Sequence, residues 1–184
     1  MTLTIPQESA FILETLRKAG YEGYIVGGAV RDLLLQKKNA YDFDFTTNAT
    51  PEQILALFPE SFYENDFGTV SIAPKHIWEM MGVKPPLPEM RQEKEKKKII
   101  DVARATKLHV SLAIPDVSIN SVDERMPNFE ITTFRSDGVY RDHRRPETVT
   151  WGKTLEEDLS RRDFTVNAMA IYIKNTETIV IDPF

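Results

Sequence analysis

The sequence predicts an α/β or α+β fold, in which a mixed sheet is flanked by helices. Short segments rich in Val, Ile, Thr and Phe alternate along the chain with segments whose apolar residues recur at helical spacing. The chain has 184 residues, 41% of them hydrophobic, which is enough to bury the core of a single domain over residues 1–184. No internal repeat or low-complexity segment interrupts this alternation.

Six elements are expected between residues 6 and 72. The last helix among them has a clear start, because Thr50 can cap it, Pro51 suits its first turn and Gln53 can complete a capping box. In order, the expected elements are a helix over 6–18, a strand over 24–26, a helix beginning near Ala29, a strand over 41–47, a helix over 51–58 and a strand over 68–72.

Residues 73–127 break the pattern. They contain a proline cluster and the charge run "RQEKEKKK" at 91–98, for which a solvated helix or loop is favoured over an RNA-contacting arm. Beyond them, Phe164 and Val166 are expected to be buried. The expected elements are a strand over 128–135, a helix within 154–163, and a hairpin formed by 168–173 and 178–182.

Composition narrows the kinds of site that the chain can hold. It has no cysteine and only three scattered histidines, so any metal is expected to be held by oxygen ligands. No apolar run approaches the roughly 20 residues of a membrane span, and the start of the chain is typical of an amphipathic helix, so a cytoplasmic protein with no membrane partner is expected. A net charge of -5 disfavours nucleic-acid binding by the whole surface but allows a local basic groove.

Two aspartates in "YDFDFTT" form the first candidate site. In an extended strand Asp42 and Asp44 share one face, while Phe43 and Phe45 share the other. Neighbouring carboxylates repel each other and aspartate suits strand interiors poorly, so a cation would compensate the arrangement. Mg²⁺ prefers such ligands together with water and substrate phosphates. A purely structural pair is the alternative.

A glycine pair just before these aspartates is the second candidate. Gly27 and Gly28 lie at a strand-to-helix turn, where a phosphate could approach the backbone, and Arg31 follows one turn into the helix. A tight turn without a ligand, and a surface ion pair of Arg31 with a neighbouring acid, remain open as alternatives.

Two later segments supply further candidates. Glu130 lies on the opposite strand face from its apolar neighbours and would be a third carboxylate if its strand lies beside the aspartate strand; otherwise it faces solvent. In "RRDFTVNAMA", Arg162 could grip phosphate and Asp163 or Asn167 could contact ribose, although a capped helix end explains the segment almost as well.

Six blocks in order resemble the head domain of class II tRNA nucleotidyltransferases, the CCA-adding enzymes, which are polymerase-beta-like nucleotidyltransferases. The resemblance covers about 8–72 and 128–184. The family also includes bacterial poly(A) polymerases, but "GTV", "EITTFR" and "FTVNAMAI" are more similar to the CCA-adding branch. The blocks are "VGGAVRDLLL", "DFDFTTNATPEQI", "GTV", "FEITTFRSDGVYRDHRRPETV", "LEEDLSRRDFTVNAMA" and "VIDPF".

The resemblance implies a polymerase-beta-like head domain that performs two-metal phosphoryl transfer. A tRNA 3′-hydroxyl attacks the α-phosphate of CTP or ATP, and one of the two Mg²⁺ ions can arrive with the nucleotide. By position, Asp42 and Asp44 match the metal-binding pair and Glu130 the third acid. The nucleotide is held by residues matching Gly28, Arg31 and Arg162, next to Gly27, with Asp163 and Asn167 in support.

The chain departs from the family pattern in two respects. Residues 73–127 replace a short turn and are expected to be an insertion, and the neck, body and tail domains that would follow "DPF" are not in this sequence. The chain is therefore expected to bind Mg²⁺ and nucleotide, to distinguish CTP from ATP poorly and to add nucleotides weakly or not at all. A catalytically silent nucleotide-binding or RNA-binding module, and a purely structural fragment, are the remaining alternatives.

Overall fold

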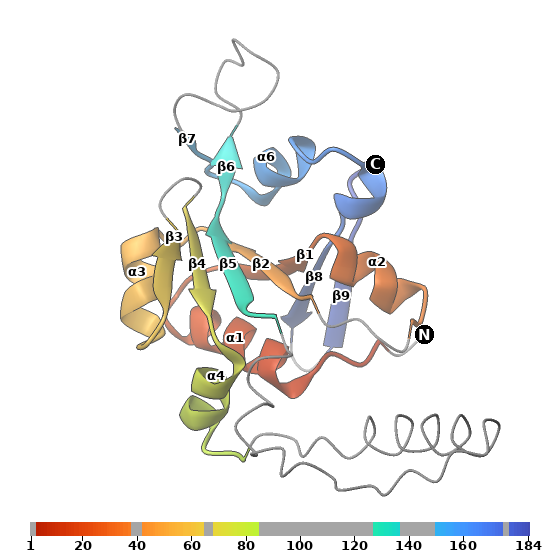
Figure 1. Ribbon diagram of the computed structural model, residues 1–184. Coiled ribbons are helices and arrows are strands. Elements are labelled where there is room, and N and C mark those ends of the chain that lie inside the picture. Colours follow the sequence, from red (N-terminus) through yellow and green to blue (C-terminus); the bar gives the residue numbers. More distant parts are fainter. Residues whose placement is uncertain (1–2, 38–41, 65–67, 85–126, 137–149, 175–176) are drawn as a thin grey trace, which may run out of the picture.

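A computed structural model describes residues 3–37, 42–64, 68–84, 127–136, 150–174 and 177–184. These form a seven-stranded mixed sheet of order β3-β4-β5-β2-β1-β8-β9 and a separate two-stranded ribbon, β6-β7 (Figure 1). The strands are β1 (Gly23–Val26), β2 (Asp44–Thr47), β3 (Phe62–Glu64), β4 (Thr69–Ile72), β5 (Phe129–Thr133), β6 (Arg135–Ser136), β7 (Thr150–Trp151), β8 (Ala170–Lys174) and β9 (Glu177–Ile181). The helices are α1 (Gln7–Lys18), α2 (Gly28–Leu34), α3 (Pro51–Leu57), α4 (Pro74–Met81), α6 (Leu155–Ser160) and the 3₁₀ turn η2 (Thr165–Asn167).

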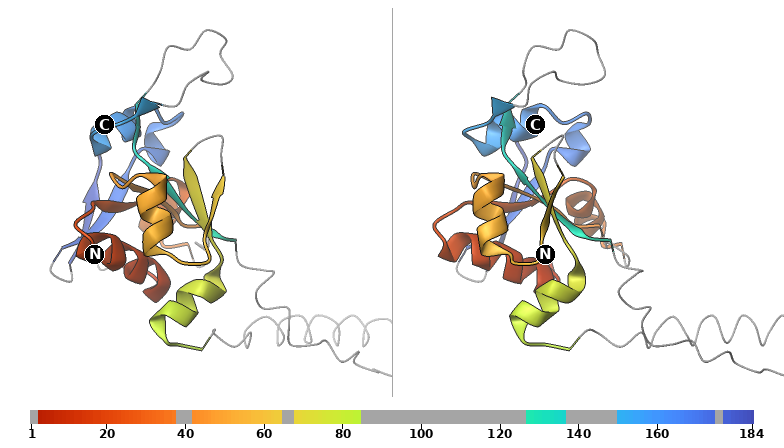
Figure 2. Two further views of the ribbon diagram at one scale, coloured as in Figure 1. Left: turned by 90° about the vertical axis from the view of Figure 1, so that its left-hand side faces the viewer. Right: turned by 60° about the vertical axis from the view of Figure 1, so that its left-hand side comes forward.

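The expected mixed sheet with flanking helices is confirmed. β2 runs parallel to β5, and its other pairing, with β1, is antiparallel. Figure 2 shows α1 and α3 beside the strands of the sheet, and Ala29 and Val30 of α2 belong to the same buried core as residues of these two helices. The capping box at Thr50 and Gln53 forms as expected. The aspartate strand is shorter than expected, because β2 begins only at Asp44.

The two faces of the sheet pack into two different cores. Ile25, Phe45 and Ile131 lie in register on one face, in a large core that includes residues of α1 and α3. On the opposite face, Val26 joins a smaller core with Phe134 from the end of β5 and residues of α6. Asp44 pairs in register with Val26, so it lies on the face that α6 packs against rather than on the face of the main core.

The start of the irregular segment is helical. Residues 73–127 leave β4 and return to β5, which are antiparallel neighbours with Ile72 opposite Phe129. α4 follows β4 directly and docks on α1, where the indole N–H of Trp78 donates to Glu8 at 2.9 Å. The proline cluster and the charge run at 91–98 lie outside the described residues.

Gly68 combines a left-handed backbone, which favours glycine, with a close approach to Trp151. Its φ is +71°, and a Cβ built there would overlap the ring of Trp151. We expect Gly68→Ala to cost about 1 kcal/mol for its left-handed backbone, and a further amount because the exposed ring of Trp151 must move from its place. Urea unfolding measures both terms together.

Gly82 provides the matched control. Its φ is +66°, but a Cβ there meets nothing within 4 Å. Gly82→Ala should therefore lose only the backbone part, about 1 kcal/mol. Equal losses in the two variants would show that the Trp151 contact contributes nothing.

Candidate functional site

Three carboxylates gather on the α6 face of the central strands. Asp44 of β2 lies directly opposite Glu130 of β5, and Asp42 precedes β2 by two residues. The expected condition for Glu130, that its strand lie beside the aspartate strand, is met. Both Asp42 and Glu130 are exposed, whereas Asp44 is partly buried. On the other side of β5, Ser71 of β4 lies in register with Glu130.

The neighbours of Asp44 disfavour its charged form. Burial raises the pKa of Asp44 to about 6, with further increases from the negative charges of Asp42 and Glu130, while Arg162 opposes them. The position is therefore short of positive charge at neutral pH, which is the electrostatic condition for binding a cation.

The raised pKa of Asp44 predicts a pH effect on stability. Because the folded-state pKa lies above the ordinary value of 3.8, the folded protein holds a proton that the unfolded chain has lost between about pH 4 and 6. In the absence of metal, Asp44 should therefore reduce the free energy of unfolding by up to about 3 kcal/mol as the pH rises through this window.

Comparison with Asp44→Asn isolates this contribution from those of other acids. The difference in unfolding free energy between the two proteins, measured in urea at pH 4, 5, 6 and 7, should grow in favour of the variant. A constant difference would mean that the carboxylate is not desolvated as its surroundings indicate.

At Gly27 the strand-to-helix turn comes close to the side chains of both Asp44 and Arg162. Its φ is +76°, and a Cβ built on it would lie 3.2 Å from Oδ2 of Asp44 and 3.6 Å from Nη1 of Arg162. A side chain here would be strained and would crowd both groups, so the close approach requires glycine. Gly28 is less restricted, since a Cβ there would meet only the flexible end of Arg31.

A buried acid that the sequence analysis missed holds Arg162. Asp158 of α6 is 0% exposed, and its Oδ2 accepts from Arg162 Nη2 at 3.2 Å and from Thr46 Oγ1 at 3.1 Å. Its Oδ1 accepts from Arg161 Nη2 at 2.8 Å and from the backbone N–H of Arg135 at 3.2 Å. The spacing D-x-x-R-R places both arginines one helical turn after the acid and was the available signal.

Burial alone would raise the pKa of Asp158. The positive charges of Arg161 and Arg162 and the hydrogen bonds outweigh this effect, so the pKa lies below its usual range. Asp158 is therefore a stable anion at neutral pH, with its charge shared between two guanidinium groups.

The remaining nucleotide-binding candidates fall into two groups. Arg31 Nη1 donates to Oδ1 of Asn167 at 3.2 Å, so these two are brought together, while Arg31 Nε also pairs with Asp32 at 2.8 Å. The neighbouring-acid pair considered from the sequence thus forms alongside the contact with Asn167. Asp163 is exposed, and within the described ranges its side chain makes no ion pair or hydrogen bond with another residue.

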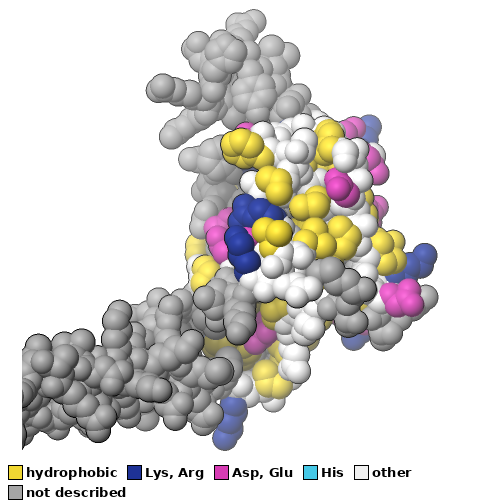
Figure 3. Space-filling model, turned by 90° about the vertical axis from the view of Figure 1, so that its right-hand side faces the viewer, with side chains coloured by type: hydrophobic (Ala, Val, Ile, Leu, Met, Phe, Trp, Pro, Cys, Tyr) yellow, Lys and Arg dark blue, Asp and Glu magenta, His cyan; other side chains and the backbone are white. Residues whose placement is uncertain are grey.

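The expected burial of Phe164 and Val166 is wrong. Phe164 is 65% exposed and Val166 48% exposed, because they lie at η2, outside the strand that follows. The side of the molecule that carries α2 shows basic side chains gathered beside a broad hydrophobic area (Figure 3). The apolar residues of this segment therefore lie on the surface rather than in a core.

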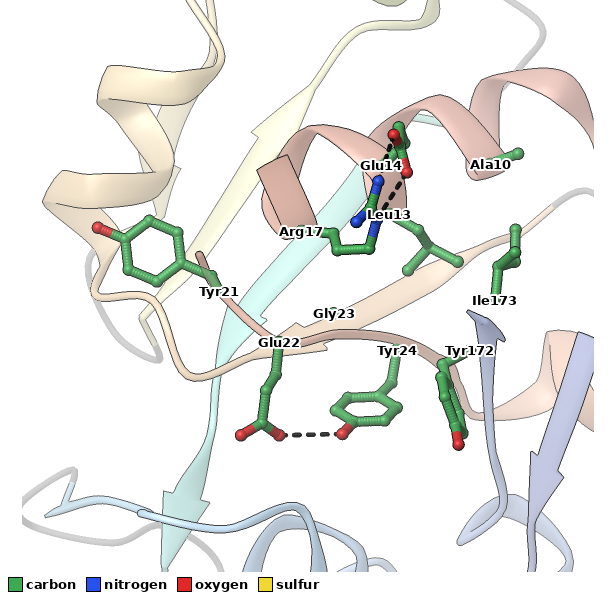
Figure 4. Close-up of a pocket in the computed structure, with 10 residues that line it drawn as sticks. All are labelled: Ala10, Leu13, Glu14, Arg17, Tyr21, Glu22, Gly23, Tyr24, Tyr172 and Ile173. Atoms are coloured by element: carbon green, nitrogen blue, oxygen red, sulfur yellow. Dashed lines mark hydrogen bonds and ion pairs between the residues drawn. The ribbon is translucent and has the colours of Figure 1, made fainter. Parts of the chain in front are cut away.

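A separate hollow is lined by none of the three carboxylates Asp42, Asp44 and Glu130. It has a volume of about 230 Å³ between α1, β1 and β8, and among its lining residues are Leu13, Tyr24 and Tyr172. Figure 4 shows the hydroxyl of Tyr24 directed to Glu22, and the ion pair of Glu14 with Arg17 on the helix above. None of the predicted site residues lines it, so this hollow does not mark the candidate site.

The described part of the chain contains neither a complete metal cage nor a membrane-spanning helix. No set of three or more His, Asp or Glu side chains there is arranged to hold a metal ion. Asp42 and Asp44, with Glu130 beside them, therefore supply carboxylates without forming a complete cage. Among the described helices, none is long and apolar enough to cross a membrane.

A family model and several curated proteins match this chain. The family model for the poly A polymerase head domain matches residues 23–122 and 90–184. The CCA-adding enzyme of Geobacillus kaustophilus (strain HTA426) is 37% identical over 180 residues, which are 97% of this chain and 31% of that enzyme. The CCA-adding enzyme of Geobacillus thermodenitrificans (strain NG80-2) is 36% identical over 178 residues, with the same coverage.

A solved structure also matches the chain over nearly its whole length. The crystal structure of the Bacillus stearothermophilus CCA-adding enzyme in complex with CTP matches with a TM-score of 0.58 and 30% identity, covering 98% of this chain. The match covers 31% of that structure's chain. The chain thus spans about a third of the length of the proteins it matches.

Proposed function

The chain belongs to the poly A polymerase head domain family, whose polymerase-beta-like nucleotidyltransferase fold it shares, and from that premise we propose that it transfers nucleotides to an RNA 3′ end. The proposed donors are CTP and ATP, and the proposed acceptor is the 3′ end of tRNA. CCA addition is favoured over poly(A) synthesis because relatives at 36% and 37% identity are CCA-adding enzymes. We further propose that residues 1–184 form one head domain with an insertion at 73–127.

One observation carries the proposal. Asp44 and Glu130 lie side by side on neighbouring strands, with Asp42 just before the strand, at the point where Gly27 and Arg162 also approach. Acids that could hold a cation thus adjoin a basic group that could hold phosphate. Phosphoryl transfer needs that juxtaposition, because catalysis depends on positioning and on neutralising charge as it develops.

Asp42 and Asp44 would hold the metal, which we propose is Mg²⁺. The residues fit it, since both are hard oxygen ligands and Asp44 is short of compensating positive charge. Two protein carboxylates suffice, because Mg²⁺ keeps several waters and takes substrate phosphates as ligands. Bound Mg²⁺ would supply Lewis-acid stabilisation of the attacking and leaving oxygens.

The other residues of the site would bind and orient the nucleotide. Arg162 and Arg31 would pair with triphosphate oxygens, for which the planar guanidinium group is well suited. The backbone of Gly27 and Gly28 leaves room for that approach. Asp163, which is exposed, and Asn167 would contact the ribose, and Glu130 would act as the third acid.

Calorimetric titration with CTP or ATP and Mg²⁺, combined with a transfer assay, tests the proposal. We expect saturable binding, and labelled CMP or AMP should join tRNA that lacks its 3′ CCA, even if weakly. A silent binding module would bind nucleotide without any transfer, and a structural fragment would give no saturable heat. Either outcome would contradict the proposal.

A further inference from the structure

Asp158 connects the acids of the site to its arginine. Thr46 follows Asp44 by two residues on β2, so the two side chains lie on the same face of the sheet. Oδ2 of Asp158 accepts hydrogen bonds from both Thr46 and Arg162. The strand that carries Asp44 is thereby tied to the side chain of Arg162 through a single buried carboxylate.

The carboxylate of Asp158 also sets the orientation of the Arg162 guanidinium group. Among the described residues, the ion pair of Arg162 is with Asp158, through Nη2, while Nη1 lies near Gly27 on the side of Asp44. Its Nε is buried and has no hydrogen-bond partner among those residues. Unrestrained, a guanidinium group this near a carboxylate would be drawn into direct pairing with it.

We propose that Asp158 is a positioning residue, which holds Arg162 away from Asp44 and directs its free edge toward the triphosphate. The inference rests on the proposed function, because it concerns the same nucleotide site. Asp158 itself is 0% exposed, so it would act on the nucleotide only through Arg162. Its anionic charge also offsets part of the positive charge of Arg161 and Arg162, which lowers the cost of holding two arginines close together.

The test compares the binding of ATP and of AMP, each with Mg²⁺, to the full chain. Asp158→Asn should weaken ATP binding about tenfold while AMP binding changes little, because only the triphosphate depends on an oriented Arg162. Arg162→Gln should give a similar loss. The double variant should lose no more than Arg162→Gln alone, because the two residues act as one unit. A purely structural role for Asp158 would reduce both affinities equally.

Two further variants complete the design. Glu156→Gln removes an exposed acid from the same helix and should leave the ratio of ATP to AMP affinity unchanged. Thr46→Val keeps both ion pairs and removes one hydrogen bond to Asp158, so it should lower the ratio by a few fold. If circular dichroism shows that Asp158→Asn does not fold, Thr46→Val becomes the variant that tests the positioning role of Asp158.

The outcomes separate the two proposals. If folded Asp158→Asn, or Thr46→Val in its place, keeps the wild-type ratio of ATP to AMP affinity, the positioning role is overturned while the proposed function stands. If the wild-type chain shows no saturable ATP binding, the proposed function fails and the positioning role fails with it.

Discussion

Replacing Asp42 and Asp44 together by alanine is expected to abolish nucleotide incorporation, by at least about a thousandfold, or about 4 kcal/mol of transition-state stabilisation. Both residues are the proposed metal ligands, and without them the charge of the transferring phosphoryl group is not neutralised. The measurement is incorporation of labelled nucleotide at saturating Mg²⁺, with urea unfolding of the same variant as the check on folding.

The fold should survive this double substitution. Asp42 is exposed and the surroundings of Asp44 disfavour its charge, so the variant should be at least as stable as the wild type at pH 7. Glu79→Gln, which removes an exposed acid from α4, is the control and should keep full activity. Activity retained by a folded Asp42→Ala/Asp44→Ala variant would remove the basis of the proposed metal site.

Replacing Phe45 by alanine should instead unfold the chain in part or completely, with a loss of about 3–5 kcal/mol. Phe45 neighbours Asp44 in the sequence but is only 1% exposed, and its ring packs edge-on against Phe129 at 6.2 Å between centroids. Removing the ring leaves a cavity in the main core. Urea unfolding followed by circular dichroism measures the loss.

Phe62 of β3 gives the matched comparison. It is also a strand phenylalanine, but it is 49% exposed on an edge strand, so Phe62→Ala should cost less than about 1 kcal/mol. Similar losses at the two positions would contradict the assignment of Phe45 to the core. Together with the aspartate variants, this pair tests whether alternate residues of one strand serve separate purposes.

Local patterns predicted much of the fold because they depend on neighbouring residues only. Thr50 and Gln53 form their capping box, and β8 pairs with β9 as expected, with Lys174 opposite Glu177. The prediction from local pattern was wrong for Phe164 and Val166. Their apolar character indicated burial, but burial depends on what the rest of the chain places over them, and in the described residues both remain largely exposed.

Predicting the candidate site required more knowledge of long-range strand pairing than predicting the individual helices and strands did. Alternation along the strand separated Asp42 and Asp44 from the two phenylalanines without any knowledge of the fold, as the burial of Phe43 and Phe45 bears out. The position of Glu130 was conditional on its strand lying beside β2. Residues 44 and 130 are far apart in sequence, and only the parallel pairing of β2 with β5 brings them into register.

Asp158 shows the limit of sequence reasoning most clearly. In "LEEDLSRRD" it is one of several acids at the start of a helix, and its neighbour Glu157 is exposed. The sequence by itself determined which residues could carry charge, which faces could be buried and which family pattern they follow. Only the tertiary structure decided that Asp158 is the acid that turns inward. There it meets Thr46 and Arg162, because burial of a charge requires partners that distant segments must supply.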